Sequence, residues 1–428
     1  MLMAGLLCVK KKGEINMKRR VVITGLGAVT SVGNNVQESW EGVKNGKNGI
    51  DFITQFDTTN MKVKIAGEVK NLDVEKFIDK RDAKRFDRTI IFGLIAAGEA
   101  FEDAGLSNVE FDPYRFGTFV TSGIGGLGTI HSEGRKAYEK GGDRVSPFFI
   151  PNSIINLIGG NIAIKFKVKG PALPVVTACS ASTNAIGEAF RYIRDGYCDI
   201  AFAGGSEAAI NELGVGGFTS MHALNVSNDI NNASIPFDKN RSGFVVAEGA
   251  GMLILEEYEH AKKRGAKIYA EMVGYGTTCD VYHITAPDET AEGITRSMKL
   301  SMQDANITPD KIDYINAHGT STLYNDKLEI LGIKKAFGEY AHKVNISSTK
   351  STTGHALGAI GAIEAIFCIK AINENIVPPT INYKEFDEEC DLNITPNKAV
   401  KRKIDYAMSN SAGFGGQNAT IIFKKFNE

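Results

Sequence analysis

The sequence predicts an α/β fold made of two similar halves, and three observations lead to this prediction. Short runs rich in Val and Ile end in glycine turns and alternate with segments whose apolar residues recur with helical period. The opening run at 21–30 has a counterpart at 268–276, and each leads into glycines. The run at 173–177 precedes a helix, as the run at 344–348 does. Because strands and helices recur in matching order, we predict a duplicated fold.

Length and repeat together set the expected domain organisation. The 428 residues exceed what one hydrophobic core usually fills. We expect an N-terminal half over 17–267, with an insertion of helices and loops at 127–168, and a C-terminal half over 268–428. In residues 1–16 an apolar piece precedes three lysines, the reverse of the order in a signal peptide. This stretch is expected to be an upstream start or a cloning remnant.

The elements of the N-terminal half follow from apolar runs and the turns that end them. Helices are predicted at 37–44 and, directly after Cys179, at 181–193. Strands are predicted at 21–30, 115–122, 173–177, 199–203 and 244–256. The Thr-Gly-Leu-Gly turn in the first strand is not a dinucleotide fingerprint, because the third glycine is misplaced and no acidic residue follows at the required distance.

The C-terminal half repeats this order. Its helix at 354–372 is apolar all round, with glycine and alanine at close intervals, which is typical of a helix packed between layers. We expect it to pair with the helix after Cys179, so that the N-termini of both converge on one site. Strands are predicted at 268–276, 313–317, 344–348 and 406–409.

Composition excludes several classes of function. The net charge of −1 gives no general attraction to nucleic acid or to an anionic membrane. No run approaches the ~18 apolar residues that span a bilayer. The six cysteines show no CxxC pair and no metal-ligand spacing with the seven histidines. We therefore expect no metal site, no disulfide scaffold and a reducing, cytoplasmic location.

Cys179 is the first candidate for chemistry. It stands between an apolar run and a helix, flanked by small residues. A strand-to-helix turn places the sulfur near the positive end of the helix, which favours the thiolate and makes a nucleophile. The alternative is a small buried core residue, since free cysteine is among the most buried residue types.

Two histidines are predicted to join Cys179. His318 lies just past a strand, and His355 is expected at a helix N-terminus. Either one alone is more often a hydrogen-bonded core residue. The repeat places Cys179 and His355 at equivalent turns, and His318 after a strand equivalent to the one that ends at Ser122. We therefore expect one thiol and two imidazoles to face one cavity.

This set of side chains favours one kind of reaction. A cysteine protease needs one histidine as base and a third group to orient it. Two imidazoles that donate to one point would instead stabilise the oxyanion of a thioester enolate. A helix N-terminus keeps His355 neutral, and a neutral imidazole can be such a donor. The backbone N–H of Phe414, in a glycine turn, is expected opposite that of Cys179 as a second oxyanion hole.

Two further features have alternative interpretations. Thr320 and Thr322 stand two apart on an extended segment, where they either bind an amide-bearing arm or cap a turn. Arg81, Lys84 and Arg85 belong to a stretch, 76–88, in which basic residues repeat every four positions with aspartates interspersed. That stretch is either a solvated helix or a docking patch.

From Met17 to its end the chain resembles the β-ketoacyl-acyl-carrier-protein synthases, type II most closely, of the thiolase-like superfamily. The resemblance implies duplicated α/β halves in five layers, α-β-α-β-α, with buried central helices. The matching stretches are VVITGLGAVTSVG, PFFIPN, TACSAS, AGGSEAAI, GVGGF, EGAGMLILEEYEHAKKRGAKIYAE, NAHGTST, STKSTTGHALGA, VPPTIN and SNSAGFGGQN.

The resemblance implies a decarboxylating condensation that elongates fatty acids, with no cofactor beyond the phosphopantetheine of the carrier protein. Cys179 would take the acyl group, and His318 and His355 would assist the decarboxylation of malonyl-carrier protein. The remaining roles implied are an active-site lysine at Lys350, a supporting acid at Glu329, a pantetheine site at Thr320 and Thr322, and a gate at Phe414.

The same resemblance implies two partners. Acyl carrier protein would dock at Arg81, Lys84 and Arg85. A second copy would form a homodimer, with Phe149 reaching across the interface. Ile124, Phe149 and Phe218 fall at the implied acyl pocket. Members often carry NSFGFGG, whereas this chain has Ala412 in place of the first phenylalanine. A bulky group that helps close the entrance is therefore missing, which bears on gating and chain length.

Other classes fit less well. A degradative thiolase would be expected to have a second cysteine near the C-terminal glycine turn, and a type III synthase an asparagine in place of one histidine. A type I synthase of the same pathway stays open as an alternative. A non-catalytic acyl-binding or chain-length subunit would be expected to lack the nucleophile, and Cys179 is present.

Overall fold

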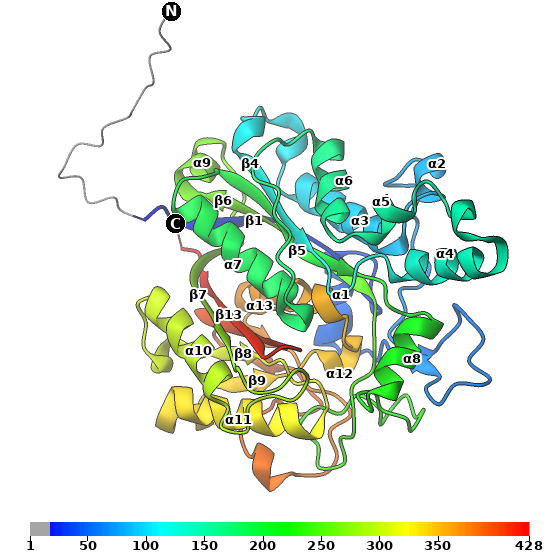
Figure 1. The fold of residues 1–428 in the computed structure, drawn as a ribbon. Helices are drawn as coiled ribbons and strands as arrows, with labels where there is room; N and C mark the ends of the chain where they lie inside the picture. Colours follow the sequence, from blue (N-terminus) through cyan, green and yellow to red (C-terminus); the bar gives the residue numbers. More distant parts are fainter. Residues whose placement is uncertain (1–17, 428) are drawn as a thin grey trace, which may run out of the picture.

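The computed structural model describes residues 18–427 (Figure 1), so the expectation for residues 1–16 lies outside the described residues. One long sheet runs through the molecule. Its strand order is β4 (Phe116–Thr121), β5 (Ile200–Glu207), β6 (Gly249–Glu257), β1 (Val21–Val29), β7 (Ala270–Cys279), β13 (Gln417–Lys425), β12 (Tyr406–Gly413), β8 (Tyr314–Asn316) and β9 (Asn345–Ser347). Two short pairs lie outside it, namely β2 (Asp51–Phe52) with β3 (Ile65–Ala66) and β10 (Ile376–Val377) with β11 (Val400–Lys401).

The sheet consists of two halves that meet between β1 and β7, where only three residue pairs connect them. In the first half β4 is parallel to β5, and β5 and β6 are antiparallel, as are β6 and β1. In the second half β8 is parallel to β12, and β12 and β13 are antiparallel, as are β13 and β7. The two halves therefore repeat the same order and the same strand directions, which confirms the predicted duplication.

Thirteen α-helices lie within residues 18–427, and they complete five layers. In Figure 1, α3 and α6 cover the outer face of the first half-sheet, α7 and α13 lie between the half-sheets, and α10 and α11 cover the outer face of the second. The layered α-β-α-β-α arrangement is confirmed. The bounds are α1 Val36–Lys44, α2 Lys80–Ala83, α3 Arg88–Asp103, α4 Leu127–Lys140, α5 Phe149–Ser153, α6 Asn156–Phe166, α7 Ala181–Arg194, α8 Glu212–Ser220, α9 Tyr258–Lys263, α10 Glu292–Asp304, α11 Leu323–Phe337, α12 Lys350–Thr353 and α13 Ile360–Glu374.

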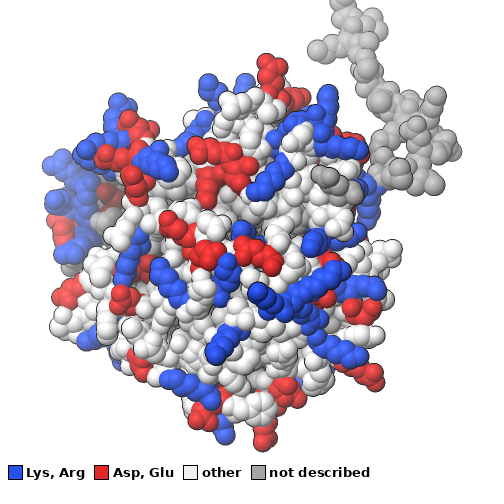
Figure 2. Space-filling view, turned by 180° about the vertical axis from the view of Figure 1, so that it is seen from behind, with Lys and Arg blue, Asp and Glu red and all other residues white. Residues whose placement is uncertain are grey.

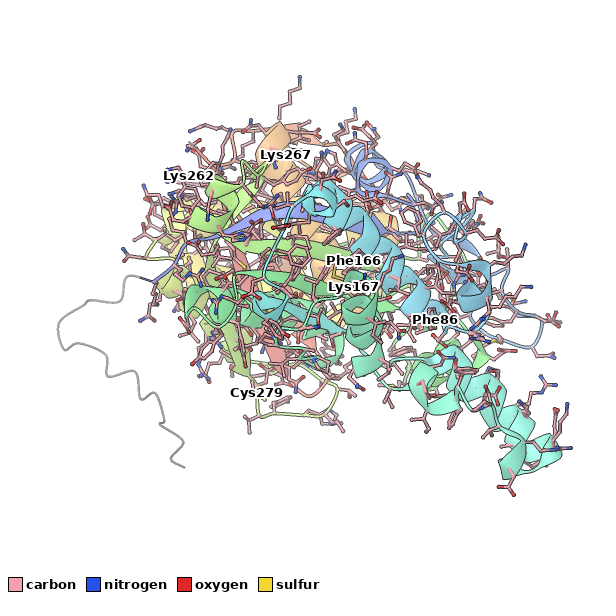
Figure 3. All side chains as sticks on the ribbon, turned by 90° about the horizontal axis from the view of Figure 1, so that it is seen from above. Phe86, Phe166, Lys167, Lys262, Lys267 and Cys279 are labelled. Carbon is pink, nitrogen blue, oxygen red and sulfur yellow. The ribbon has the colours of Figure 1, made fainter. Side chains whose placement is uncertain are left out.

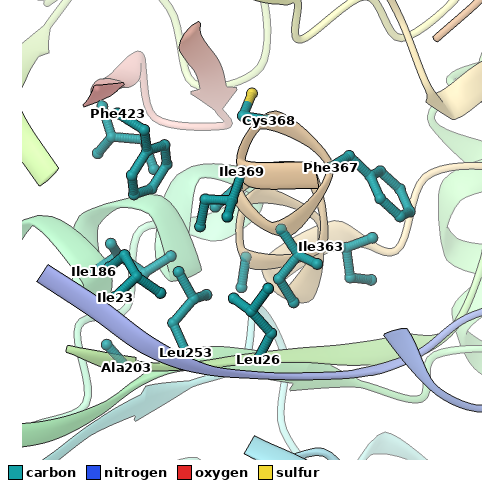
Figure 4. Close-up of a cluster of buried hydrophobic side chains, with 14 of the residues drawn as sticks. Ile23, Leu26, Ile186, Ala203, Leu253, Ile363, Phe367, Cys368, Ile369 and Phe423 are labelled. Carbon is teal, nitrogen blue, oxygen red and sulfur yellow. The ribbon is translucent and has the colours of Figure 1, made fainter. Parts of the chain in front are cut away.

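The core is built around α13, as Figure 4 shows. Ile363, Phe367 and Ile369 are almost fully buried and belong to the cluster that also holds Leu253 of β6 and Phe423 of β13. Each such side chain contributes about 1.5–3 kcal/mol by leaving water. A helix with apolar residues all round is stable here because both half-sheets cover it, as its composition predicts.

The two central helices approach each other closely near their N-termini. A Cβ atom on Gly361 would lie 1.9 Å from the Thr183 hydroxyl oxygen. Only glycine allows this separation. Ser182 Oγ also accepts a hydrogen bond of 3.0 Å from the Ala362 N–H. The beginnings of α7 and α13 are thereby fixed against each other, next to Cys179 and His355.

The predicted strand over 173–177 does not form. Ala172 makes a single bridge to Thr118, and the Leu173 N–H donates to the Thr118 carbonyl at 2.9 Å. Pro174 then has no N–H to donate, so the ladder stops. Further along, the Val175 carbonyl accepts a hydrogen bond of 2.8 Å from the Thr121 hydroxyl, where a strand would accept one from a backbone N–H. The segment still lies where β9 lies in the second half, at the outer edge.

The single helix expected over 76–88 is also wrong. Residues 80–83 form the short α2, and α3 begins at Arg88. Asp79 and Asp87 each accept a backbone N–H two residues ahead, so each starts its own helix. The spacing of the basic residues suggested one continuous face, but Asp79 and Asp87 between them are helix caps.

The predicted helix over 354–372 begins later than expected. Gly354 has a φ of +73° and ends α12, and α13 starts at Ile360. The His355 backbone pairs instead with the segment before β6, since its N–H donates to the Val245 carbonyl at 2.8 Å. His355 is therefore in an extended link and not at a helix N-terminus. Strand β13 was not predicted.

Two features concern the outer surface. The helix α4, within 127–168, projects from the body in both Figures 1 and 3. Figure 2 shows basic and acidic side chains interspersed over the face opposite to that of Figure 1. Among the described helices, none has the length and apolar character needed to cross a membrane.

Candidate active site

Residues from both halves line one cavity of about 360 Å³. They come from the turn before α7, the loop after β8, the link between α12 and α13, and the β12–β13 turn. The structure thus brings together the residues predicted to carry the chemistry: Cys179, His318, Thr320, Thr322, His355 and Phe414.

Cys179 occupies a strained turn directly before α7. Ala178 has a φ of +51°, which a residue with a Cβ atom rarely adopts. The Ser180 hydroxyl donates to the Thr177 carbonyl at 2.8 Å and Asn184 donates to the Thr177 hydroxyl at 2.8 Å, which hold the turn. The turn directs the Cys179 side chain into the cavity.

The thiol of Cys179 is not predisposed to ionise, contrary to the expectation from the helix N-terminus. Burial raises its pKa to about 12, and the charge of Glu207 acts in the same direction. The positive charge of Lys350 and the backbone N–H groups of Cys179 and Phe414 act against burial. Burial outweighs these groups, so the resting sulfur carries its proton.

The turn that carries Phe414 packs against the turn that carries Cys179. The backbone N–H groups of Cys179 and Phe414 both act to lower the pKa of the thiol. A Cβ atom on Gly413 would lie 2.6 Å from the Thr177 carbonyl oxygen, so β12 comes directly against the Cys179 turn. Two converging N–H donors beside a nucleophile form an oxyanion hole.

The two imidazoles are neighbours. The ring centroids of His318 and His355 are 5.4 Å apart and the rings are nearly perpendicular, at 85°. Burial, followed by the charge of Lys350, lowers both pKa values well below the usual range, so both rings are neutral. Each Nδ1 atom is buried without a hydrogen-bond partner. A buried N–H donor without an acceptor is rarer in proteins than a buried acceptor without a donor. Nδ1 therefore carries no proton, and the proton is on Nε2, towards the cavity.

Glu329 supports His318 through the backbone. Its carboxylate accepts the N–H groups of His318 and Gly319 at 2.8 Å each, and an Asn410 amide N–H at 3.2 Å. Burial raises the pKa of Glu329 to about 7. It therefore fixes the loop that carries the imidazole and makes no bond to the ring.

Lys350 is buried beside the three reactive side chains. Its ammonium donates to Glu364 of α13 at 2.6 Å. Its charge lowers the pKa of Cys179, His318 and His355. Glu364 was not predicted. Its signal in the sequence is one carboxylate in the otherwise apolar run 360–369, because such a residue needs a buried partner.

Glu207 is a second carboxylate that was not predicted. It accepts the Ser122 hydroxyl and the Gly123 N–H at 2.7 Å each, and the Gly358 N–H at 3.0 Å. Glu207 thus joins the loop after β4 to the link before α13. The sequence signal is an acidic residue at the end of a buried strand.

Thr320 and Thr322 lie at the cavity wall with their hydroxyl oxygens 3.0 Å apart. Thr322 precedes α11 but its side chain makes no capping bond. Turn capping, the alternative, therefore does not explain Thr322, and both hydroxyls are available to a ligand in the cavity.

The residues implied for the acyl pocket divide into two groups. Ile124 and Phe218 pack in the same apolar cluster as Cys179. The ring of Phe218 contacts that of Phe244, which in turn contacts His355 at 5.1 Å between centroids. Phe149 on α5 is half-buried and does not line the cavity of the single chain.

The residues implied for docking are exposed around α2. Arg81, Lys84 and Arg85 all reach solvent, and the Arg85 guanidinium lies 5.3 Å from the centre of the Phe148 ring. Asp79 and Asp87 are used as helix caps there. The basic side chains consequently dominate the outward surface of this short helix.

Comparisons with known proteins agree with this geometry. Residues 18–261 match the β-ketoacyl synthase N-terminal domain, and residues 269–384 match the C-terminal domain. The chain is 48% identical over 412 residues to the 3-oxoacyl-[acyl-carrier-protein] synthase 2 of Staphylococcus aureus strain COL, covering 96% of this chain and 100% of the relative. Identity to the synthase of the same name in Synechocystis sp. is also 48%, over 96% and 99% of the two chains.

A solved structure gives the same result. A chain from the complex of a type II polyketide-synthase acyl-carrier protein with its ketosynthase superposes with a TM-score of 0.88 at 34% identity, over 96% of this chain and 100% of that one. Domain matches over both halves, near-complete alignment to the relatives and the shared fold lead to one conclusion: the chain belongs to the β-ketoacyl synthase family.

Proposed function

We propose that the protein condenses an acyl group, delivered on acyl carrier protein, with malonyl-acyl-carrier protein to give 3-oxoacyl-acyl-carrier protein and CO2, the elongation step of fatty acid synthesis. One observation carries this proposal: a buried cysteine, two neutral imidazoles and two backbone N–H donors face one cavity. The named activity of the relatives supports it.

In the first step Cys179 takes the acyl group. The sulfur attacks the thioester carbonyl, whose oxygen accepts the N–H groups of Cys179 and Phe414. The carbon–sulfur bond to pantetheine breaks, and the proton of the thiol passes to the departing pantetheine sulfur. Burial makes the Cys179 thiol less acidic. The N–H donors offset this because they stabilise the negative charge that forms on the carbonyl oxygen in the transition state.

In the second step malonyl-carrier protein loses CO2. The bond from C2 to the carboxylate breaks and its electron pair forms an enolate on the thioester. His318 and His355, both neutral, donate N–H bonds to that oxygen. A charged imidazole would be costly in this buried pocket, and burial prevents it.

In the third step C2 attacks the acyl carbonyl on Cys179. A carbon–carbon bond forms, the tetrahedral oxyanion again rests on the two backbone N–H groups, and the Cys179 thiolate leaves and takes up a proton from solvent. Burial, reinforced by the charge of Lys350, keeps the imidazoles neutral, and Glu329 orients the loop of His318. No cofactor is needed beyond the carrier's phosphopantetheine, held by Thr320 and Thr322.

The proposal includes two protein partners and a location in the cytoplasm. Acyl carrier protein, a partner in the solved ketosynthase complex, would dock at Arg81, Lys84 and Arg85. A second copy of the chain would cover the segment 148–176, where large apolar side chains are exposed: Phe148, Ile150, Ile154, Ile164, Leu173 and Val176. Phe149 would then reach the partner's acyl pocket, beside Ile124 and Phe218.

Trapping the covalent intermediate tests the proposal. Purified protein is incubated with carrier protein that bears an acyl group, in the absence of malonyl-carrier protein. It is then digested and analysed by mass spectrometry. We expect one acyl group as a thioester on the peptide that holds Cys179, removable by hydroxylamine, and none on Cys198 or Cys368. Turnover by a protein that never carries an acyl group on Cys179 would rule the mechanism out.

A further inference from the structure

A small second chamber opens off the reaction cavity at Ala412. It has a volume of about 20 Å³, which is enough for one group of the size of a water molecule. It extends to Ile294 of α10 and Leu328 of α11. The residues that border both the cavity and the chamber are Asp280, Pro287, His318, Asn325, Ala412 and Asn418.

Strand alternation directs the side chain of Ala412 into this chamber. Ser411 shares a hydrogen bond of 2.7 Å with Thr183 of α7, on the Cys179 side of β12. Asn410 donates to Glu329 of α11 at 3.2 Å, on the opposite side. Ala412 is two residues from Asn410 in the strand, so its side chain points to the same side of the sheet. A larger side chain at position 412 would therefore fill the chamber.

The polar groups around the chamber bind one another. Asn418 donates to Asp280 at 2.6 Å, and the Glu329 carboxylate accepts two backbone N–H groups. An entering polar group would find few free partners and would lose its bonds to water. Asp288 accepts the Glu292 N–H, and Asn325 donates to Asp326. Apart from these groups and the His318 ring, the lining is hydrocarbon: Pro287, Ala291, Ile294, Leu328 and Ala412. The chamber therefore suits a small apolar group.

His318 connects this chamber to the chemistry. Its ring forms a wall of the cavity in which C2 of the malonyl unit must lie to become an enolate. His318 also borders the chamber. A substituent on C2 is therefore within reach of the space that Ala412 leaves open.

We propose that Ala412 determines specificity for the extender unit and admits a malonyl thioester with a methyl group on C2. The inference rests on the proposed condensation. The acyl group on Cys179 and 2-methylmalonyl-carrier protein would give 2-methyl-3-oxoacyl-carrier protein, CO2 and the free thiol, with one proton taken up. Bonds form and break as for malonyl, and the methyl group occupies the chamber.

The test compares the kcat/KM for 2-methylmalonyl-carrier protein with that for malonyl-carrier protein, using one acyl primer and the full-length protein. For the wild type we expect a ratio above about 0.1, and for Ala412→Phe a ratio at least tenfold lower, since one methyl-sized misfit is worth about 10–200-fold. Ala412→Gly, which leaves the chamber open, should keep the wild-type ratio. If a phenylalanine is not tolerated in β12, Ala412→Val serves as the second variant, because valine fills the chamber in part.

The outcomes separate the two proposals. If the wild type condenses malonyl but rejects the methylated unit, or if Ala412→Phe and Ala412→Val leave the ratio unchanged, the role of Ala412 is wrong and the condensation stands. If the folded wild type condenses neither unit, the proposed function itself is wrong.

Discussion

Cys179 illustrates how one residue combines two opposed requirements. The strained Ala178 and the N–H groups beside the sulfur suit a nucleophile, whereas burial raises the pKa of the thiol to about 12. A protonated thiol stays inert until a thioester enters the oxyanion hole. Such a site protects the sulfur from adventitious oxidants and alkylating agents.

The raised pKa predicts the pH dependence of alkylation. Because only the thiolate reacts, the rate at which iodoacetamide labels Cys179 should rise about tenfold per pH unit from pH 7 to 9 and show no plateau there. Mass spectrometry of the Cys179 peptide measures the rate. A plateau below pH 9 would show a lowered pKa and would contradict the structure.

Removing the sulfur should separate the two halves of the reaction. Cys179→Ala is expected to abolish acyl transfer and condensation while malonyl decarboxylation continues, because the enolate is stabilised by His318 and His355 and not by sulfur. Released CO2 and 3-oxoacyl product are measured side by side. His318→Ala should reduce decarboxylation by about two orders of magnitude or more, as expected for one oxyanion donor; equal decarboxylation in both variants would refute the assignment.

At the scale of elements, α12 and α13 are joined by the buried ion pair Lys350–Glu364. Both side chains are at most 1% exposed. Removing one partner leaves an uncompensated buried charge, which typically costs about 3–5 kcal/mol.

Unfolding measurements test this pair. Lys350→Met should lower the free energy of unfolding in urea by about 3–5 kcal/mol, and the double variant Lys350→Met/Glu364→Leu should regain most of the loss. A single variant as stable as the wild type would show that the pair does not bear on stability.

The short helix α2 carries the predicted carrier-protein contact. Reversing two exposed charges, Arg81→Glu with Lys84→Glu, should raise KM for acyl-carrier protein about tenfold or more and should do so most at low salt. The matched control is Lys262→Glu with Lys267→Glu, which Figure 3 places far from Phe86 and α2. Equal effects of both pairs would show a general charge effect instead of a docking site.

The sequence predicted elements well where local signals agree and poorly where tertiary contacts decide. The apolar period of α7 and the mainly apolar composition of α13 identify buried helices directly. The strand over 173–177 fails because Pro174 removes a ladder bond at an edge, and the helix over 76–88 fails because aspartate caps break it. The start of α13 was misplaced because His355 pairs its backbone with a distant segment, which no local pattern shows.

At the scale of the whole molecule, the duplication places the site. Two half-sheets with the same strand order bring the turn after 173–177 and the link after β9 to the same centre, so residues far apart in sequence converge. The sequence predicted Cys179, His318 and His355 for that reason. Glu207 and Glu364 were missed because their partners are a serine hydroxyl, backbone N–H groups and a lysine that the fold brings in.

The exposed apolar segment 148–176 predicts the oligomeric state. Sedimentation equilibrium should show a dimer of the 46.2 kDa chain. Val176→Asp should shift it to monomer at micromolar concentration, since an unpaired charge would be buried in the interface. Phe386→Asp is the control, because Phe386 is also an exposed apolar side chain but lies in the other half. A monomeric wild type would contradict the dimer.

The most direct measurement follows both products of the reaction at once. Purified protein is given an acyl-carrier protein and malonyl-carrier protein labelled with ¹³C at the free carboxylate, and labelled CO2 and 3-oxoacyl-carrier protein are quantified by mass spectrometry. We predict equal amounts of the two products, both dependent on His318 and His355, with product formation also dependent on Cys179. CO2 released without any 3-oxoacyl product, or product formed after Cys179 is replaced by alanine, would contradict carbon–carbon bond formation at this site.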